Sequence, residues 1–233
     1  MPAPTPPLLG VDFTSSPSRR KPIVVARGRR EGALLRLEAV EAVADFAGFE
    51  ALLVAPGPWF GAFDFPFGLP RAFVDSQRLG ATAAEVIAEL RCRCGSRMAF
   101  RELIDAWGNA RPAGHRLPHR ATDRAAPGHV STSPLQTRYV PVGFMYFEGL
   151  ARLIDAPVIL PPPHAGDPAR LAVEGYPGRL ADQPRVGGVA LDPLAHRPPE
   201  APEHGRAARE VDARERRVAE QPVGDRDRVA GDG

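Results

Sequence analysis

The stretch Trp59–Pro70, WFGAFDFPFGLP, constrains the fold of this chain more than any other. Its apolar first half is typical of a strand that is covered on both faces, whereas Pro66, Gly68 and Pro70 prevent the strand from continuing. Asp64 stands where the apolar run ends, and a buried carboxylate is costly unless a metal ion, a basic group or helix N–H groups bind it. The stretch therefore predicts a core strand that delivers one carboxylate to a site at its end.

Two further apolar stretches end in an acid and a turn. Leu8–Ser16, LLGVDFTSS, places Asp12 at the end of a strand, before a turn of small hydroxyl side chains. Leu171–Pro177, LAVEGYP, places Glu174 in the same way. We expect the fold to bring Asp12 and Asp64 together, with Glu174 as a candidate third member. The alternative is that each acid only caps the turn or helix that follows it.

The rest of the chain predicts an α/β fold with a mixed sheet and flanking helices. Before residue 64 the hydrophobic pattern predicts strands at 8–13, 23–27 and 33–38, a helix over 41–53, and the strand that ends at Asp64. Antiparallel hairpins followed by a helical crossover indicate a mixed sheet with helices on its faces. After residue 70, helical spacing occurs over residues 83–90, 100–107 and 139–154. Residues 109–138 are polar and irregular, and a loop of this length is usually functional or disordered.

Composition bounds the domain organisation and the cellular setting. A length of 233 residues with 43% hydrophobic residues suits one good-sized domain, and a formal charge of +2 neither indicates nor excludes a nucleic-acid partner. Cys92 and Cys94 are too close for a disulfide framework and lack the second pair of a zinc site. No run of residues is apolar and long enough to span a membrane, and the N-terminus lacks a signal-peptide pattern, so we expect a cytoplasmic protein.

The two ends of the chain differ from its middle. We expect residues 1–7 to be a disordered lead-in, residues 8–181 to form the domain, and residues 182–233 to be a disordered or aberrant tail. From Pro177 onward the sequence contains no aromatic residue and no Ile, Ser, Thr or Lys, and such a segment cannot easily bury a core. A reading-frame shift in a GC-rich gene would give this composition.

Five segments resemble a bacterial domain-of-unknown-function family of predicted RNase H-like nucleases. They are GVDFTSSPSRRKPI, GAFDFPFGLP, HRATD, STSPLQTRYVPVG and GDPARLAVEGYPG, and the resemblance covers about residues 8–181. It implies an RNase H-like sheet, whose first three strands are antiparallel and whose later strands add through helices. It also implies metal-dependent hydrolysis of phosphodiester bonds in DNA or RNA.

By this resemblance, Asp12 is the central acid, Asp64 the second metal ligand and Glu174 a candidate third, and the three are the candidate catalytic residues. The implied metal is Mg²⁺ or Mn²⁺, because these hard cations prefer oxygen ligands. Two such ions can stabilise both the attacking water and the leaving oxygen of a phosphodiester. Arg120 of the HRATD segment is implied to face the phosphate. Arg20 and Lys21 follow Asp12 closely and are either further substrate contacts or part of a solvated turn.

One departure from the family and two alternatives remain open. RNase H-like nucleases place a further acid on a C-terminal helix, where this chain has its proline- and arginine-rich tail, so we expect the activity to be impaired. Actin-like and sugar-kinase-like ATPases share the strand topology and an acid followed by a hydroxyl turn such as Thr14–Ser16, but they need a second domain. No P-loop or Gly-rich dinucleotide motif occurs in the sequence. A non-catalytic RNase H-like remnant is the other alternative.

Overall fold

The computed structural model describes residues 5–125, 130–161 and 164–176. The tail expected over 182–233 lies outside these ranges, as do residues 1–4 of the expected lead-in. Contacts divide the chain after Gln183, and every described residue belongs to the first of the two units. Within it, the Phe60 N–H donates to the Pro7 carbonyl at 2.9 Å, so backbone pairing begins one residue before the predicted first strand.

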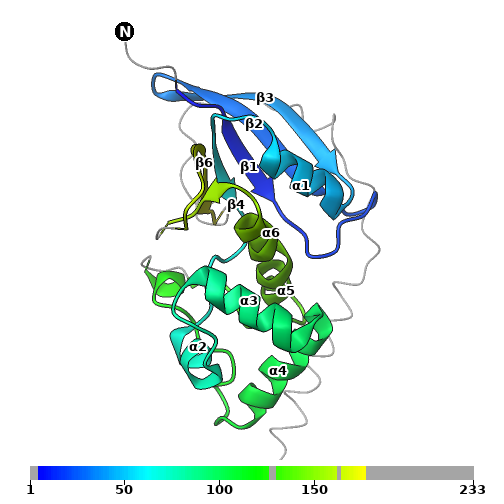
Figure 1. Cartoon of the computed structure of the whole chain (residues 1–233), viewed down its shortest axis with the longest axis vertical. Helices are drawn as coiled ribbons and strands as arrows, with labels where there is room; N and C mark the ends of the chain where they lie inside the picture. The colour runs from blue at the N-terminus through cyan, green and yellow to red at the C-terminus, as the bar shows by residue number, and fades with distance from the viewer. Residues whose placement is uncertain (1–4, 126–129, 162–163, 177–233) are drawn as a thin grey trace, which may run out of the picture. The chain divides into compact units, whose positions relative to one another are not determined.

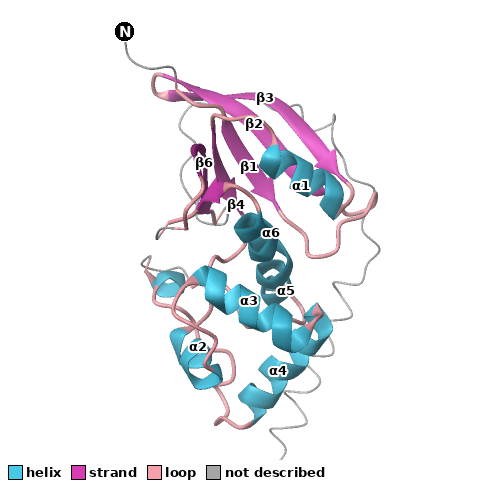
Figure 2. Ribbon diagram, in the orientation of Figure 1, coloured by secondary structure: helices cyan, strands magenta, loops and turns pink. Residues whose placement is uncertain are grey.

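Six strands of the described ranges form one mixed sheet in the order β3-β2-β1-β4-β6-β5 (Figures 1 and 2). Their bounds are β1 Leu8–Asp12, β2 Ile23–Glu31, β3 Leu34–Val43, β4 Trp59–Phe63, β5 Val158–Ile159 and β6 Asp167–Glu174. β1, β2 and β3 pair antiparallel, β4 runs parallel to β1 and to β6, and β5 runs parallel to β6. The predicted α/β class with a mixed sheet and flanking helices is confirmed.

Several helices begin at polar caps that the sequence provides. Thr82 and Glu85 form a reciprocal capping box at the start of α3, and Ser96 accepts from the Ala99 N–H at the start of α4. The helical bounds are α1 Phe46–Val54, α2 Arg71–Gln77, α3 Ala83–Cys94, α4 Arg97–Asn109, the 3₁₀ turn η1 Thr122–Arg124, α5 Val142–Met145, the π-helical η2 Tyr146–Leu150 and α6 Ala151–Asp155. None of the helices in the described ranges combines the length and the apolar character needed to cross a bilayer.

The predicted helix over 41–53 is wrong in its first part. β3 continues to Val43, which pairs with Ile23 of β2, and Glu41 pairs with Val25. α1 begins only at Phe46, because Asp45 caps it by accepting from the Gly48 N–H at 2.8 Å. Cross-strand pairing with β2 therefore overrides the helical spacing of the residues before Asp45.

Burial alternates along the central strands, so the two faces of the sheet differ. Leu9 and Val11 of β1, Ile23 and Val25 of β2 and Phe63 of β4 are buried. Phe63 packs edge-on against Phe49 of α1, which covers this face (Figure 1). The alternate positions of the same strands, Gly10, Asp12, Val24, Ala26 and Ala62, are half-buried or exposed. The sheet thus has one covered face and, within the described ranges, one open face.

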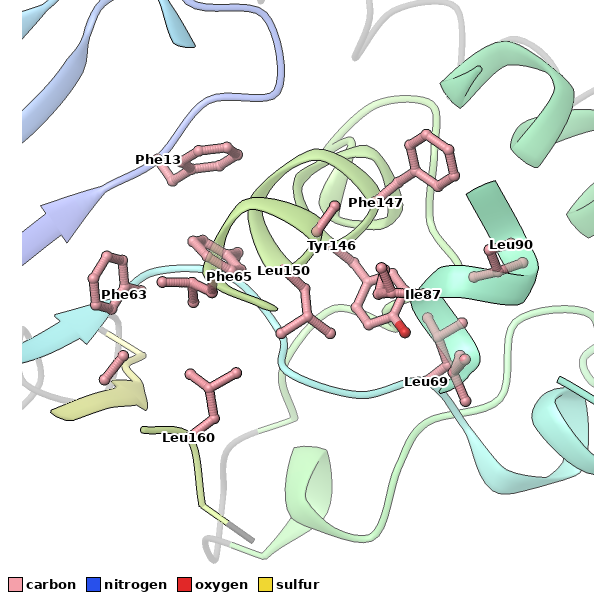
Figure 3. Packing of buried hydrophobic residues seen from close by; sticks show 14 of the residues in the cluster. Phe13, Phe63, Phe65, Leu69, Ile87, Leu90, Tyr146, Phe147, Leu150 and Leu160 are labelled. Carbon is pink, nitrogen blue, oxygen red and sulfur yellow. The ribbon is translucent and has the colours of Figure 1, made fainter. Parts of the chain in front are cut away.

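The covered face continues into a core shared with the helices. Figure 3 shows Tyr146, Phe147 and Leu150 of the helical stretch 142–155 between the phenylalanines of the sheet side and the side chains of α3. The ring of Phe65, which directly follows Asp64, packs against that of Phe63 at a centroid distance of 5.9 Å. The exit of β4 is therefore fixed by the hydrophobic core immediately beside the predicted acid.

Candidate acidic site at the strand ends

Parallel pairing of β1 with β4 brings Asp12 and Asp64 together. The register pairs Val11 with Phe63, and each aspartate is the next residue on its strand. The Asp64 N–H donates to the Val11 carbonyl at 2.9 Å, which extends the pairing to the aspartates themselves. The predicted meeting of these two acids at one edge of the sheet is what the structure contains.

The electrostatics of this pair favour a cation. Burial raises the pKa of the half-buried Asp64 carboxyl above its usual value, and the negative charge of Asp12 raises this pKa further. Asp12 is exposed, so the pair opens to solvent. Two carboxylates that repel each other in this way are stabilised by a proton or by a metal ion between them.

Glu174 lies at the same edge of the sheet but is held by protein groups. The register pairs Glu174 with Phe63, so Glu174 is one position out of step with Asp64. Its carboxylate accepts from the Phe67 N–H at 2.9 Å and from the Arg120 guanidinium at 2.8 Å and 2.5 Å. Across the described ranges, no group of three or more Asp, Glu, His or Cys side chains is placed to hold a metal ion.

Arg120 joins Glu174 to Asp123 in a partly buried ion-pair network. Its guanidinium makes two hydrogen bonds to Asp123, at 3.0 Å and 2.6 Å, besides the two to Glu174. The Asp123 side chain is 0% exposed and that of Arg120 is 14% exposed. Burial alone would lower the pKa of Arg120, but the hydrogen bonds that it donates to Glu174 and Asp123 raise this pKa overall. Two carboxylates against one guanidinium leave a net negative charge, and four of the five guanidinium N–H groups are already bonded to them, so Arg120 has one N–H left for a phosphate unless it gives up some of these bonds.

Asp64, Asp123 and Glu174 line one pocket of about 520 Å³. Asp64 and Glu174 form part of its wall, together with the hydroxyl-bearing Thr132. Met145 and Tyr176 provide apolar surface in the same pocket. The pocket therefore combines negative charge, hydrogen-bonding groups and an apolar wall beside the aspartate pair.

Arg20 and Lys21 lie on the loop that leaves the sheet after Asp12. Asp12 pairs with Val24 in the antiparallel register, so this loop departs from and returns to the edge that carries the aspartates. Both cationic side chains are exposed. Reciprocal backbone bonds between Ser18 and Lys21, each 3.1 Å, close the tip of the loop. A contact of Arg20 and Lys21 with substrate stays a prediction.

Two contributions to the site do not follow from sequence patterns. Arg97 of α4 donates a hydrogen bond to the carbonyl of the buried Ser15, which ties the loop after Asp12 to a helix. The three-residue spacing of Arg120 and Asp123 suggests a local pair, but the bond from Arg120 to Glu174 joins positions far apart in the chain. Both depend on tertiary packing.

Comparisons with protein-family models, with curated proteins and with solved structures find no match for this chain.

Proposed function

We propose that this chain is a metal-dependent RNase H-like nuclease, in which Asp12 and Asp64 bind Mg²⁺ or Mn²⁺ and phosphodiester bonds of a nucleic acid are hydrolysed. The observation that carries the proposal is the aspartate pair at adjacent ends of two parallel central strands, with the pKa of Asp64 raised by burial and by Asp12. The strand order supports the RNase H-like part, because three antiparallel strands are followed by strands parallel to β1.

The aspartate pair fits a hydrated hard cation. Mg²⁺ usually keeps several waters and is held by one or two carboxylates together with substrate phosphates. An exposed Asp12 beside a half-buried Asp64 offers such a half-open site. Glu174 is committed to Arg120 and the Phe67 N–H, so a second ion would need oxygen ligands from the substrate or the release of Glu174 from Arg120.

Each residue then has a defined role. A bound Mg²⁺ or Mn²⁺ would supply polarisation of the phosphodiester and a lowered pKa of bound water. Asp12 and Asp64 provide the charge that holds it. Arg20 and Lys21 contact the phosphate backbone, which fixes the position of the substrate without selecting a base sequence. The bond from Arg97 to Ser15 keeps the loop that carries them in place.

The test is a cleavage assay on the full chain with single-stranded DNA, duplex DNA, RNA and an RNA–DNA hybrid. We expect cleavage that requires Mg²⁺ or Mn²⁺, stops with a chelator and falls by orders of magnitude in Asp12→Asn, because this change removes charge and keeps shape. Glu102→Gln, at an exposed position of α4, is the matched control and should keep full activity.

Three other outcomes of these assays would contradict the proposal or favour an alternative function. Cleavage that survives Asp12→Asn contradicts the proposal. ATP hydrolysis without cleavage of any nucleic acid favours the actin-like or sugar-kinase-like alternative. A folded chain that neither cleaves nucleic acid nor binds metal is the non-catalytic RNase H-like remnant.

A further inference from the structure

β3 is an exposed apolar edge strand. Within the described ranges it ends the sheet and pairs on one side only, with β2. Leu35 is 74% exposed, Leu37 54% and Val40 55%. The strand has ten residues and contains neither Pro nor Lys, the residues that commonly protect a sheet edge from pairing with another chain.

A bulge in β3 places Leu37 and Val40 on the same face of the sheet. The register shifts so that Gly28 of β2 pairs with Leu37 while the preceding Arg27 pairs with Ala39, which leaves Glu38 as the extra residue. Ala26 pairs with Val40, and Ala26 and Gly28 lie on the same face because they are two positions apart in β2. Leu37 and Val40 therefore share the open face, although two residues that are three positions apart in a regular strand would point to opposite faces.

The bulge also makes the strand complementary to itself. Leu37 and Val40 lie at equal distances along the sequence from the point between Glu38 and Ala39. Arg36 and Glu41 also lie at equal distances from this point. In an antiparallel pairing of two copies about this point, the apolar residues meet on the open face. Arg36 and Glu41 meet as opposite charges on the other face, because each is adjacent in its strand to an open-face residue.

We propose that two copies of this chain associate through antiparallel pairing of their β3 strands, which gives one sheet continuous across both copies. The contacts are Leu37 with Val40 of the second copy and Arg36 with its Glu41, each formed twice. The existing partners, Glu31 for Arg36 at 3.4 Å and Arg27 for Glu41 at 2.6 Å, belong to solvent-exposed ion pairs, which are weak and readily exchanged. β2 and then β1 lie inward of β3, so both aspartate sites stay open.

Charge reversal on the full chain tests this interface, with the molar mass measured by light scattering and the dissociation constant by sedimentation equilibrium. We expect a dimer for the wild type. Arg36→Glu or Glu41→Arg places like charges opposite each other twice, and each should raise the dissociation constant about tenfold. The double variant Arg36→Glu/Glu41→Arg should restore it, and the two single variants mixed together should form the mixed dimer in preference to either homodimer.

Two controls keep the result specific. Both positions are exposed, so the circular dichroism spectrum of each variant should match that of the wild type, and Glu102→Arg, an exposed reversal on α4, should leave the dimer intact. A second variant, Leu37→Lys, should also weaken the dimer. A monomeric wild type overturns the proposal, and so does an association that none of the β3 variants changes.

Discussion

Asp64 is the residue whose surroundings most determine the chemistry of the site. It follows the buried Phe63 and precedes the buried Phe65, so its carboxylate cannot become fully exposed to solvent. Its pKa is raised by burial and by the charge of Asp12. In the absence of a cation the ionised pair therefore destabilises the fold, and a bound cation reverses this effect.

The first prediction concerns Asp64→Asn in the presence of a chelator. Because the folded-state pKa of Asp64 lies above the unfolded value of about 3.8, the folded state holds this proton more tightly. The free energy of unfolding of the wild type therefore falls as the pH rises from the unfolded-state pKa of Asp64 through its raised folded-state pKa, and it stays low at higher pH. Asp64→Asn should lack this loss and melt at a higher temperature than the wild type at neutral pH.

Thermal denaturation followed by circular dichroism, with and without Mg²⁺, measures the difference. Mg²⁺ should raise the melting temperature of the wild type and of Glu102→Gln but not that of Asp64→Asn. A variant that is less stable than the wild type in chelator at neutral pH would show that the aspartates do not repel each other in the folded state.

The second residue-scale prediction concerns Arg120→Ala. This change leaves the fully buried Asp123 without its cation and removes one of the two groups that bind Glu174. Breaking a buried pair from one side costs about 3–5 kcal/mol of the free energy of unfolding. Urea denaturation should show this loss, whereas Arg124→Ala, at an exposed neighbouring position, should change stability by about 0.5 kcal/mol or less. Equal stability of the two variants would mean that Arg120 does not support the pocket.

At the scale of elements, the strands that carry the aspartates are predictable because their signals are local. An apolar run followed by Pro66 and Gly68 fixes both the presence of β4 and its end, and the observed strand stops at Phe63. The boundary between β3 and α1 is not predictable in this way, because Val43 satisfies the helical spacing but pairs with β2, as Glu41 does. Strand pairing is a non-local interaction that the pattern of one segment does not contain.

The structure of the polar segment 109–138 also depends on interactions that its local sequence pattern does not contain. Its composition predicts an irregular loop, yet Asp123, Ser133, Leu135 and Thr137 are buried. Ser133 donates to the Pro118 carbonyl at 2.7 Å, and Asp123 is bonded to Arg120, so both of these buried polar side chains find their partners within the loop. Polarity in the sequence therefore did not mean exposure here.

A prediction at this scale concerns Gly149, in the π-helical turn of the stretch 142–155. A Cβ at this position would lie 2.8–2.9 Å from ring atoms of Phe65, the residue after Asp64. Gly149→Ala should therefore destabilise the fold by about 1–3 kcal/mol, which outweighs a gain of at most about 1 kcal/mol in helix propensity. Gly68→Ala is the control, because nothing lies within 4 Å of its added Cβ. Denaturant unfolding measures both, and a stabilised Gly149→Ala would show that the ring of Phe65 moves aside freely.

At the scale of the whole molecule, the sequence predicts the edge at which the site lies better than it predicts the ligand set. Asp12 and Asp64 meet because parallel strands place their carboxyl ends at one edge. Glu174 reaches the same edge, but Arg120 from the 109–138 loop binds it, and this contact depends on how the loop packs against β6. RNase H-like nucleases have a further acid on a C-terminal helix, and the proline- and arginine-rich tail that this chain has in its place lies outside the described residues.

Calorimetric titration of the full chain with Mn²⁺ measures cation binding at the aspartate pair directly. We expect binding to the wild type that weakens by at least about tenfold in Asp12→Asn and in Asp64→Asn. Binding should stay unchanged in Glu102→Gln, the exposed acid on α4, and should persist in Glu174→Gln because Arg120 already engages that carboxylate. Wild-type affinity in both aspartate variants would contradict the claim that Asp12 and Asp64 form the cation site.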